Sequence, residues 1–155
     1  MDATYFYICL IIGMFLSLLL DERLGITPGG MIVPGYLALV ADQPLQIVLV
    51  FAVSFLVYWL VNHVLPHFVV LFGKRKYIAT LFLTLVIKLA LDVAFPYVNS
   101  ALMPLAAVEL RGVGAITPAL LASSYGRQHI RYTIPATLIL TYATFGLATL
   151  LFMVI

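Results

Sequence analysis

The sequence predicts an all-α integral membrane protein with six membrane segments, arranged as two three-segment inverted repeats. Three observations predict this fold: an apolar composition, a repeated Gly/Pro-rich motif and a one-sided distribution of basic residues. Of the 155 residues, 65% are hydrophobic and 9% are charged, whereas soluble domains are about half apolar and about a quarter charged. We expect one polytopic membrane domain, 1–155, with repeat halves of about 1–72 and 73–155 and a broken middle segment in each half.

Composition also excludes several classes of protein. The net charge of +2 is too small to indicate nucleic-acid binding, and the single cysteine, Cys9, cannot form an internal disulfide. The first apolar run has no basic leader and no Ala-x-Ala cleavage site before Asp21. We therefore expect it to be a retained helix and not a cleaved signal peptide.

Apolar runs set the expected order of elements, since a membrane-spanning helix needs about 20 residues. Four runs are long and continuous, and two are interrupted by Gly and Pro. The continuous runs are Tyr5–Leu20, Leu45–Leu65, Tyr77–Phe95 and Tyr132–Ile155, and the interrupted runs are Gly25–Ala41 and Leu105–Tyr125.

The first interrupted run organises the prediction. Glu22–Leu39 contains four glycines and two prolines in 18 residues. Glu109–Ala122 repeats its pattern, with Gly30–Ala38 aligned on Gly114–Ala122 and an acid and a base before each. Proline removes a backbone donor and glycine admits positive φ, so both runs should be broken helices that are buried or line a wet cavity. Such a repeated break points to a functional site, whose candidate residues are Glu22, Arg23, Gly25, Pro28, Gly29, Gly30, Pro34, Gly35, Glu109, Arg111, Gly112, Gly114 and Pro118.

Basic residues decide between two topologies. If both broken runs cross the membrane, all the basic turns face one side: Arg23, Lys74, Arg75, Lys76, Arg127 and Arg131. If both are re-entrant, Arg127 and Arg131 lie opposite the Lys74–Lys76 run. Cytoplasmic loops carry the excess of Lys and Arg, which favours six crossings with both termini outside the cytoplasm, and the re-entrant arrangement stays as an alternative.

Charges inside the apolar runs form two pairs. Lys88 and Asp92 are four residues apart and so share a helix face. Glu109 and Arg111 lie beside the second break. Each pair is either a structural ion pair or the polar lining of a path through the membrane; for Glu109 and Arg111 the position beside the break favours function.

Other polar groups are easier to interpret. Lys74, Arg75 and Lys76, with Arg127 and Arg131, are expected to contact anionic lipid or a cytoplasmic partner. His63 and His67 are spaced as a metal pair, but Pro66 interrupts the helix between them, so we expect no metal. We expect no catalytic residue and no cofactor either, because no phosphate-binding loop, nucleophile elbow or HExxH motif is present.

Several motifs together resemble the membrane subunit of bacterial poly-γ-glutamate synthase, the PgsC/CapC family. They are Glu22-Arg23-x-Gly25-Ile26 with Pro28, Val33-Pro34-Gly35-Tyr36-Leu37-Ala38-Leu39-Val40, Gln43-Pro44, Gly73-Lys74-Arg75-Lys76 with Ala79-Thr80-Leu81, Lys88-Leu89 with Asp92, and Arg111-Gly112-Val113-Gly114 followed by Pro118. The resemblance is collinear over nearly the whole chain, and the last run matches only in general character.

The resemblance implies a non-catalytic subunit of the bacterial plasma membrane. In that family a separate cytoplasmic ligase uses ATP to join glutamate, and the membrane subunit is thought to anchor the ligase and aid polymer export. The implied partners are this ligase, other synthase subunits, membrane lipid and poly-γ-glutamate, and the small chain is expected to form a homo-oligomer. Two alternatives remain: a small secondary transporter of an amino acid or other anion, and a purely structural anchor.

Overall fold

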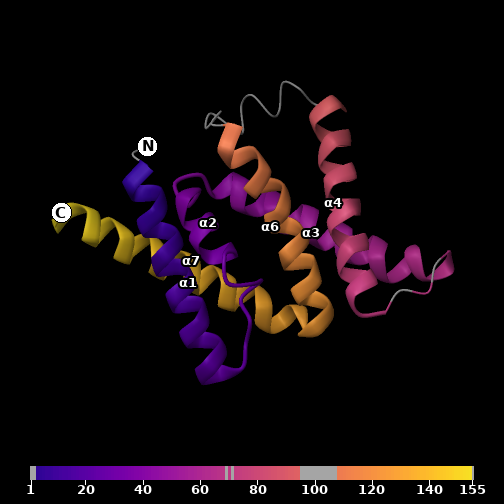
Figure 1. Cartoon of the computed structure of the whole chain (residues 1–155), viewed down its shortest axis with the longest axis horizontal. Helices are drawn as coiled ribbons and strands as arrows, with labels where there is room; N and C mark the ends of the chain where they lie inside the picture. The colour runs from indigo at the N-terminus through magenta and orange to yellow at the C-terminus, as the bar shows by residue number, and fades with distance from the viewer. Residues whose placement is uncertain (1–2, 69, 71, 95–107, 155) are drawn as a thin grey trace. The chain divides into compact units, whose positions relative to one another are not determined.

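The structure is a computed structural model that describes residues 3–68, 70, 72–94 and 108–154; side chains at 3, 92 and 108–115 lie outside the description. Within these ranges all regular secondary structure is helical, which confirms the all-α prediction (Figure 1). The elements are α1 (Ala3–Leu24), α2 (Val33–Leu39), α3 (Pro44–His63), the 3₁₀ helix η1 (Leu65–His67), α4 (Lys74–Ala94), α6 (Val108–Arg127) and α7 (Ile130–Val154).

Three of these helical stretches are long and apolar enough to cross a membrane. They are Thr4–Leu24, Pro44–His67 and Ile130–Val154, with 21, 24 and 25 residues. At 1.5 Å per residue each covers at least about 30 Å, the thickness of the hydrocarbon core. Helices α4 and α6 have 21 and 20 residues, but both carry several charged residues. The arrangement of six crossings as an inverted repeat stays a prediction.

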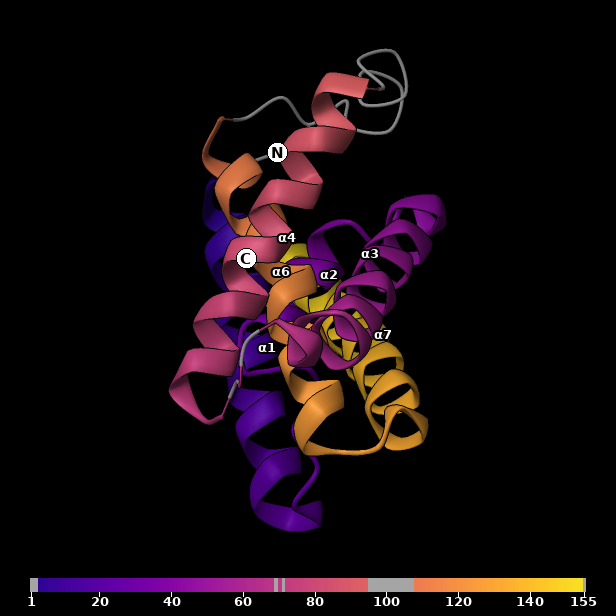
Figure 2. The same cartoon turned by 90° about the vertical axis from the view of Figure 1, so that its right-hand side faces the viewer.

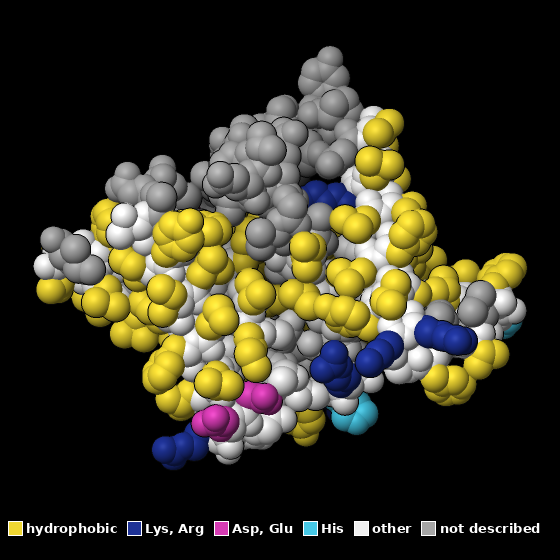
Figure 3. Space-filling view, viewed as in Figure 1, with side chains coloured by type: hydrophobic (Ala, Val, Ile, Leu, Met, Phe, Trp, Pro, Cys, Tyr) yellow, Lys and Arg dark blue, Asp and Glu magenta, His cyan; other side chains and the backbone are white. Residues whose placement is uncertain are grey.

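Large apolar side chains face outward along the long helices. On α1 the exposed set includes Tyr7, Ile11 and Phe15, which are spaced four residues apart and so share one face. Hydrophobic side chains are also spread widely over the face of the molecule seen in Figure 3. A soluble protein rarely exposes so much contiguous apolar surface, and a lipid environment explains it.

The helices belong to two compact units. The first unit comprises residues 1–47 and 124–155, and the second comprises 48–123. Each unit therefore contains helices from both sides of the predicted repeat boundary near Gly73. In the first unit α1, α2 and α7 pack together; the second contains α3, α4 and α6.

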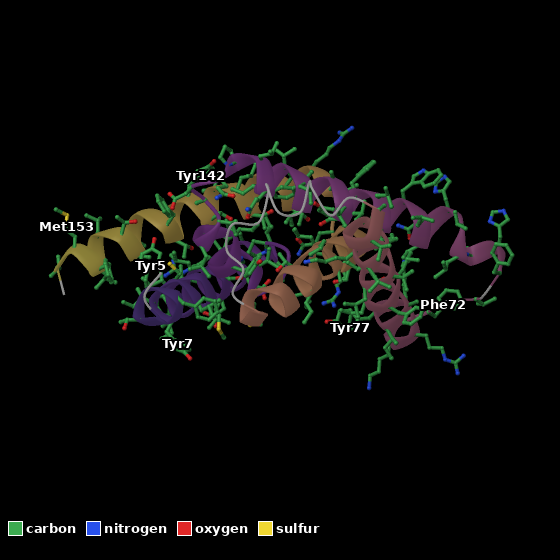
Figure 4. The ribbon with its side chains drawn as sticks, turned by 90° about the horizontal axis from the view of Figure 1, so that it is seen from above. Tyr5, Tyr7, Phe72, Tyr77, Tyr142 and Met153 are labelled. Carbon is green, nitrogen blue, oxygen red and sulfur yellow. The ribbon has the colours of Figure 1, made fainter. Side chains whose placement is uncertain are left out.

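Helices α1 and α7 of the first unit run in opposite directions and contact each other near both ends. Near the start of α1, the Tyr5 ring meets Phe152 edge to face, with centroids 5.5 Å apart. Just beyond the end of α1, Gly25 accepts a hydrogen bond from Gln128, which directly precedes α7. Figure 4 shows Tyr5 between the two helices, whereas Tyr7 points away from them.

The second unit has a small apolar core between its three helices. Val57 and Val61 of α3 are buried with Ala122 of α6, and Leu83 and Ile87 of α4 pack against them. The four α3 and α4 positions are spaced by four residues and so present one face of each helix. This core holds the three helices of the second unit together.

Two expectations about the helices are corrected. The second interrupted run, Leu105–Tyr125, was expected to be broken, but residues 108–127 form one continuous helix that contains Pro118 (Figure 2). A single proline removes only one donor, and membrane helices tolerate it; α7 likewise contains Pro135. The first run is also longer than Tyr5–Leu20, since α1 continues through the charged residues to Leu24.

Candidate functional site

The predicted break after the first helix is present. Helix α1 ends at Leu24, and the chain has no regular structure until α2 begins at Val33. Three of its glycines adopt positive φ: Gly25 at 64°, Gly29 at 73° and Gly30 at 107°. Side chains other than glycine rarely adopt this conformation, which explains why these positions break the helix. We call residues 25–32 the return segment.

The short helix after the return segment is entirely buried. All seven residues of α2 are buried, Pro34 and Gly35 included, and Val40 after it is buried as well. A seven-residue helix is only about 10 Å long and is not stable alone. Its stability therefore comes from packing against α1 and α7.

Two glycines allow α1 and α2 to touch at backbone distance. A Cβ atom on Gly13 would lie 2.4 Å from the Gly35 Cα and 2.5 Å from its nitrogen. A Cβ atom on Gly35 would lie 3.0 Å from the Cys9 carbonyl oxygen and 3.0 Å from the Leu10 Cα. Small residues permit this close approach in membrane helices, so packing explains Gly35 fully.

The return segment and α2 together run back along α1 (Figure 1). Gly35 lies against residues 9, 10 and 13 of α1, about 20 Å from the end of α1 at a rise of 1.5 Å per residue. Further on, Asp42 lies within electrostatic range of Tyr5, near the start of α1. Residues 25–42 thus cover nearly the length of α1 in the opposite direction.

The predicted residues of the first break divide into two groups. Pro28, Gly29, Pro34 and Gly35 are buried and Gly30 is half-buried. By contrast, Glu22, Arg23 and Gly25 are exposed at the end of α1. The acid and base of the motif therefore do not join the buried glycines and prolines in one site.

Arg127 and Arg131 belong to the same end of the first unit as Glu22 and Arg23. Both arginines are exposed, on either side of the turn between α6 and α7. Gln128 in that turn contacts the return segment. The structure therefore gathers the basic residues of two distant turns at one end of this unit, an arrangement that the six-crossing and the re-entrant topologies both require.

The second motif has the burial pattern of the first, although its backbone is continuous. Ile32 is 44% exposed and the aligned Ile116 is 43% exposed. The next aligned pairs are buried in both motifs: Val33 and Thr117, Pro34 and Pro118, Gly35 and Ala119, Leu37 and Leu121, and Ala38 and Ala122. The repeated sequence thus gives these aligned positions the same burial in both motifs, whether or not the residues before them are helical.

Lys88 lies on a polar face of α4. Its ammonium nitrogen is buried, and Thr84 and Thr80, four and eight residues earlier, are buried on the same face. Both hydroxyls donate to carbonyls of their own helix, at 2.7 Å. Five predicted site residues lie where only the backbone is described: Asp92, Glu109, Arg111, Gly112 and Gly114. Neither predicted ion pair is therefore tested.

The basic run at the start of α4 does not act as one surface. Lys74 and Arg75 are exposed, whereas Lys76 is half-buried and donates a hydrogen bond to the Asn62 side-chain oxygen at 2.8 Å. This bond ties the start of α4 to the end of α3. Two of the three predicted contact residues are thus available to a lipid or a partner, and Lys76 has a structural role.

The two spaced histidines have other contacts. The His63 ring stacks on Trp59 with centroids 5.5 Å apart. The Nδ1 atom of His67 lies 3.0 Å from the His63 carbonyl oxygen. Over the described part of the chain, no group of three or more His, Cys, Asp or Glu residues is placed to hold a metal ion.

Sequence reasoning missed two features of the first unit. One is a row of fully buried threonines on α7, Thr133, Thr137, Thr141 and Thr144. Their spacing of about four residues in an apolar run would have revealed it. The other is Gln128, whose side-chain amide contacts the return segment; no local pattern indicates a contact across 101 residues.

Comparison with known proteins gives matches over most of the chain. The family described as capsule biosynthesis CapC matches residues 12–134. A "Capsule biosynthesis protein CapC" of Bacillus anthracis is 40% identical over 153 residues, 99% of each chain. A "PGA biosynthesis protein CapC" of Bacillus subtilis (strain 168) is 42% identical over 147 residues, 95% of each chain. No solved structure matches.

Proposed function

We propose that this chain, which belongs to the capsule biosynthesis CapC family, is a membrane subunit of a bacterial poly-γ-glutamate synthase. A role in capsule polymer synthesis follows from family membership. The observation that carries the finer proposal is the collinear similarity, over 95% of both chains, to a protein named for PGA biosynthesis. The three long apolar helices fit a subunit of the bacterial plasma membrane.

We propose that the chain crosses the membrane six times, with both termini outside the cytoplasm. The antiparallel course of residues 25–42 along α1 supports a full crossing by the first motif and not a re-entrant loop. The contact between Tyr5 and Phe152 supports placing both termini on one side. Accessibility of tags on the two termini tests this topology, and a cytoplasmic terminus at either end overturns it.

Lys88 is the residue that we propose to meet the polymer within the membrane. Its nitrogen is buried on the face of α4 that also carries two buried threonines, where a cation interacts with carboxylates more strongly than in water. Poly-γ-glutamate carries one carboxylate per residue, so a cation at this depth would stabilise it during export. Arg111 has the same proposed role from its position in the second motif.

Replacement of Lys88 by Met tests this role, because it removes the charge and keeps an unbranched side chain. Loss of one charge-assisted hydrogen bond weakens binding of the polymer by about tenfold to hundredfold. We therefore expect surface polymer to fall by at least about tenfold. The matched control is Leu89→Met on the exposed neighbour, which should leave polymer unchanged. Normal polymer from Lys88→Met cells with normal membrane levels of the protein would exclude the role.

Anchoring of the cytoplasmic ligase is the second part of the proposal. Lys74 and Arg75 are exposed at the start of α4 and are the natural contacts for an acidic surface. Reversal of both charges should reduce ligase co-purification, while Lys74→Arg should not. Uptake of labelled glutamate into vesicles by this protein alone would instead favour the secondary transporter, and ligase capture without any effect of Lys88 would favour the structural anchor.

A further inference from the structure

One side chain holds two backbone groups of the return segment. Gln128 lies between the end of α6 and the start of α7. Its Oε1 accepts a hydrogen bond from the Thr27 N–H at 3.2 Å, and its Nε2 donates to the Gly25 carbonyl oxygen at 3.2 Å. The side-chain amide thus pairs with a donor and an acceptor two residues apart, as a neighbouring β-strand would.

This pairing occurs where the chain leaves α1 and regular hydrogen bonding ends. The Gly25 N–H still bonds to the Asp21 carbonyl oxygen at 2.8 Å, and the Gly29 N–H bonds to the Thr27 carbonyl oxygen at 2.8 Å. Between them, Gln128 provides partners for Thr27 N–H and Gly25 C=O. Backbone polar groups near the hydrocarbon core require such partners, because lipid supplies none.

The position of these two hydrogen bonds also determines the direction in which the return segment leaves α1. Gly25 and Thr27 flank Ile26, and the chain then enters the buried pair Pro28 and Gly29. Fixing both flanking residues fixes the angle at which the return segment turns back along α1. The turn that follows Arg127 is thereby joined to the segment that leads into α2.

We propose that Gln128 is a positioning residue that sets the course of the return segment. Its effect on polymer output rests on the proposed function, but its effect on the segment does not. Loss of the amide should leave insertion of the helices intact, since α1 and α7 also meet at Tyr5 and Phe152. It should make the return segment more accessible and mobile.

A cysteine reporter at Ile26 tests the proposal directly. The only native cysteine, Cys9, is buried and is replaced by Ala in all variants. The rate of maleimide labelling of Ile26→Cys is then measured in intact membranes with Gln128 and with Leu or Glu at that position. The control is His129→Leu, which changes the exposed neighbour and should leave the rate unchanged.

We expect Gln128→Leu to raise the labelling rate about tenfold, as the loss of one to two neutral hydrogen bonds implies. Gln128→Glu should give a smaller rise, because its carboxylate still accepts from Thr27 but cannot donate to Gly25. Equal rates for all variants would overturn the proposal. So would loss of both variants from the membrane, since Gln128 would then be a determinant of folding and not of segment position.

Polymer output, measured in the same cells, separates this inference from the proposed function. Faster labelling with reduced polymer supports both. Faster labelling with unchanged polymer leaves Gln128 as the positioning residue and argues against a part for the return segment in polymer export.

Discussion

The contact between Gly13 and Gly35 gives the most direct test of how the first unit is packed. Replacement of Gly13 by Ala would place a Cβ atom 2.4 Å from the Gly35 Cα. Carbon atoms in contact are normally about 3.5–4.0 Å apart. Helices α1 and α2 would therefore have to separate by at least about 1 Å, since both contact partners are backbone atoms that cannot rotate away.

The cost of that separation follows from the packing. Overpacking a close contact costs about 1–3 kcal/mol, and a gap of about 1 Å forfeits up to half of the dispersion energy along the contact. Because α2 is buried over its whole length, we take the upper end of this cost; less the gain of about 1 kcal/mol from Ala in a helix, we expect Gly13→Ala to lower the free energy of unfolding by about 2 kcal/mol. Gly35→Ala, with nearest contacts at 3.0 Å, should lower it by about 1 kcal/mol.

Reactivity of Cys9 measures the effect, because this single cysteine is buried beside Gly35. Labelling by a maleimide during denaturant unfolding of the detergent-solubilised protein reports when α1 and α2 separate. Gly146→Ala is the matched control, since a Cβ atom there meets nothing within 4 Å and Ala favours the helix by about 1 kcal/mol. If Cys9 is labelled no faster in Gly13→Ala than in Gly146→Ala, the close contact between Gly13 and Gly35 is wrong.

Three further predictions concern single residues. Gly73 has φ 57°, so Gly73→Ala should lower the free energy of unfolding by about 1 kcal/mol and Gly73→Asn by less, which thermal unfolding can compare. Lys76→Met should cost about 1 kcal/mol by removing the bond to Asn62, whereas Lys74→Met on the exposed neighbour should have no measurable effect on the melting temperature. Thr141→Val should leave both stability and polymer output unchanged, because the hydroxyl donates to the Thr137 carbonyl of its own helix at 2.6 Å; a loss of polymer would instead show that the threonine row contacts the polymer.

The first break was predictable because its cause is local. Pro28 followed by Gly29 and Gly30 combines a missing donor with two residues that adopt positive φ, and no helix accommodates all three. In the second motif Gly112, Gly114 and Pro118 are separated by other residues, so the helix continues through each of them. The repeat was therefore a sound guide to burial and a poor guide to backbone conformation.

Residues that contact one another across the chain could not be predicted. The Gln128 amide meets Gly25 and Thr27 at sequence separations of 103 and 101, and nothing near any of the three indicates the partner. The basic run illustrates a second limit. Successive helical residues point about 100° apart, so Lys76 turns toward α3 while its neighbours are exposed, although the three appear equivalent in the sequence.

The composition of the two units bears on the predicted inverted repeat. The predicted repeat pairs α1 with α4, the first motif with α6, and α3 with α7. The first unit contains α1, α2 and α7, and the second contains α4, α6 and α3. Each helix of one unit thus has its predicted counterpart in the other unit, and the third helix of each half belongs to the unit of the other half. The predicted repeat is equally compatible with units that each consist of the three segments of one sequence half. The sequence therefore could not indicate that the third segments belong to the opposite units.

The predicted pairing of α1 with α4 shows how the buried faces of these two helices differ. Cys9, Gly13 and Ser17 are the buried positions of α1, at intervals of four residues. On α4 the same intervals join Thr80, Thr84 and Lys88, whose nitrogen is buried. One face is narrow and allows two backbones to touch, whereas the other has hydroxyls and a cation. In the predicted repeat, these paired helices would give one unit a close backbone contact and the other a polar face, which is why the proposed contact with a polyanion is assigned to Lys88 and not to the glycines of the first motif.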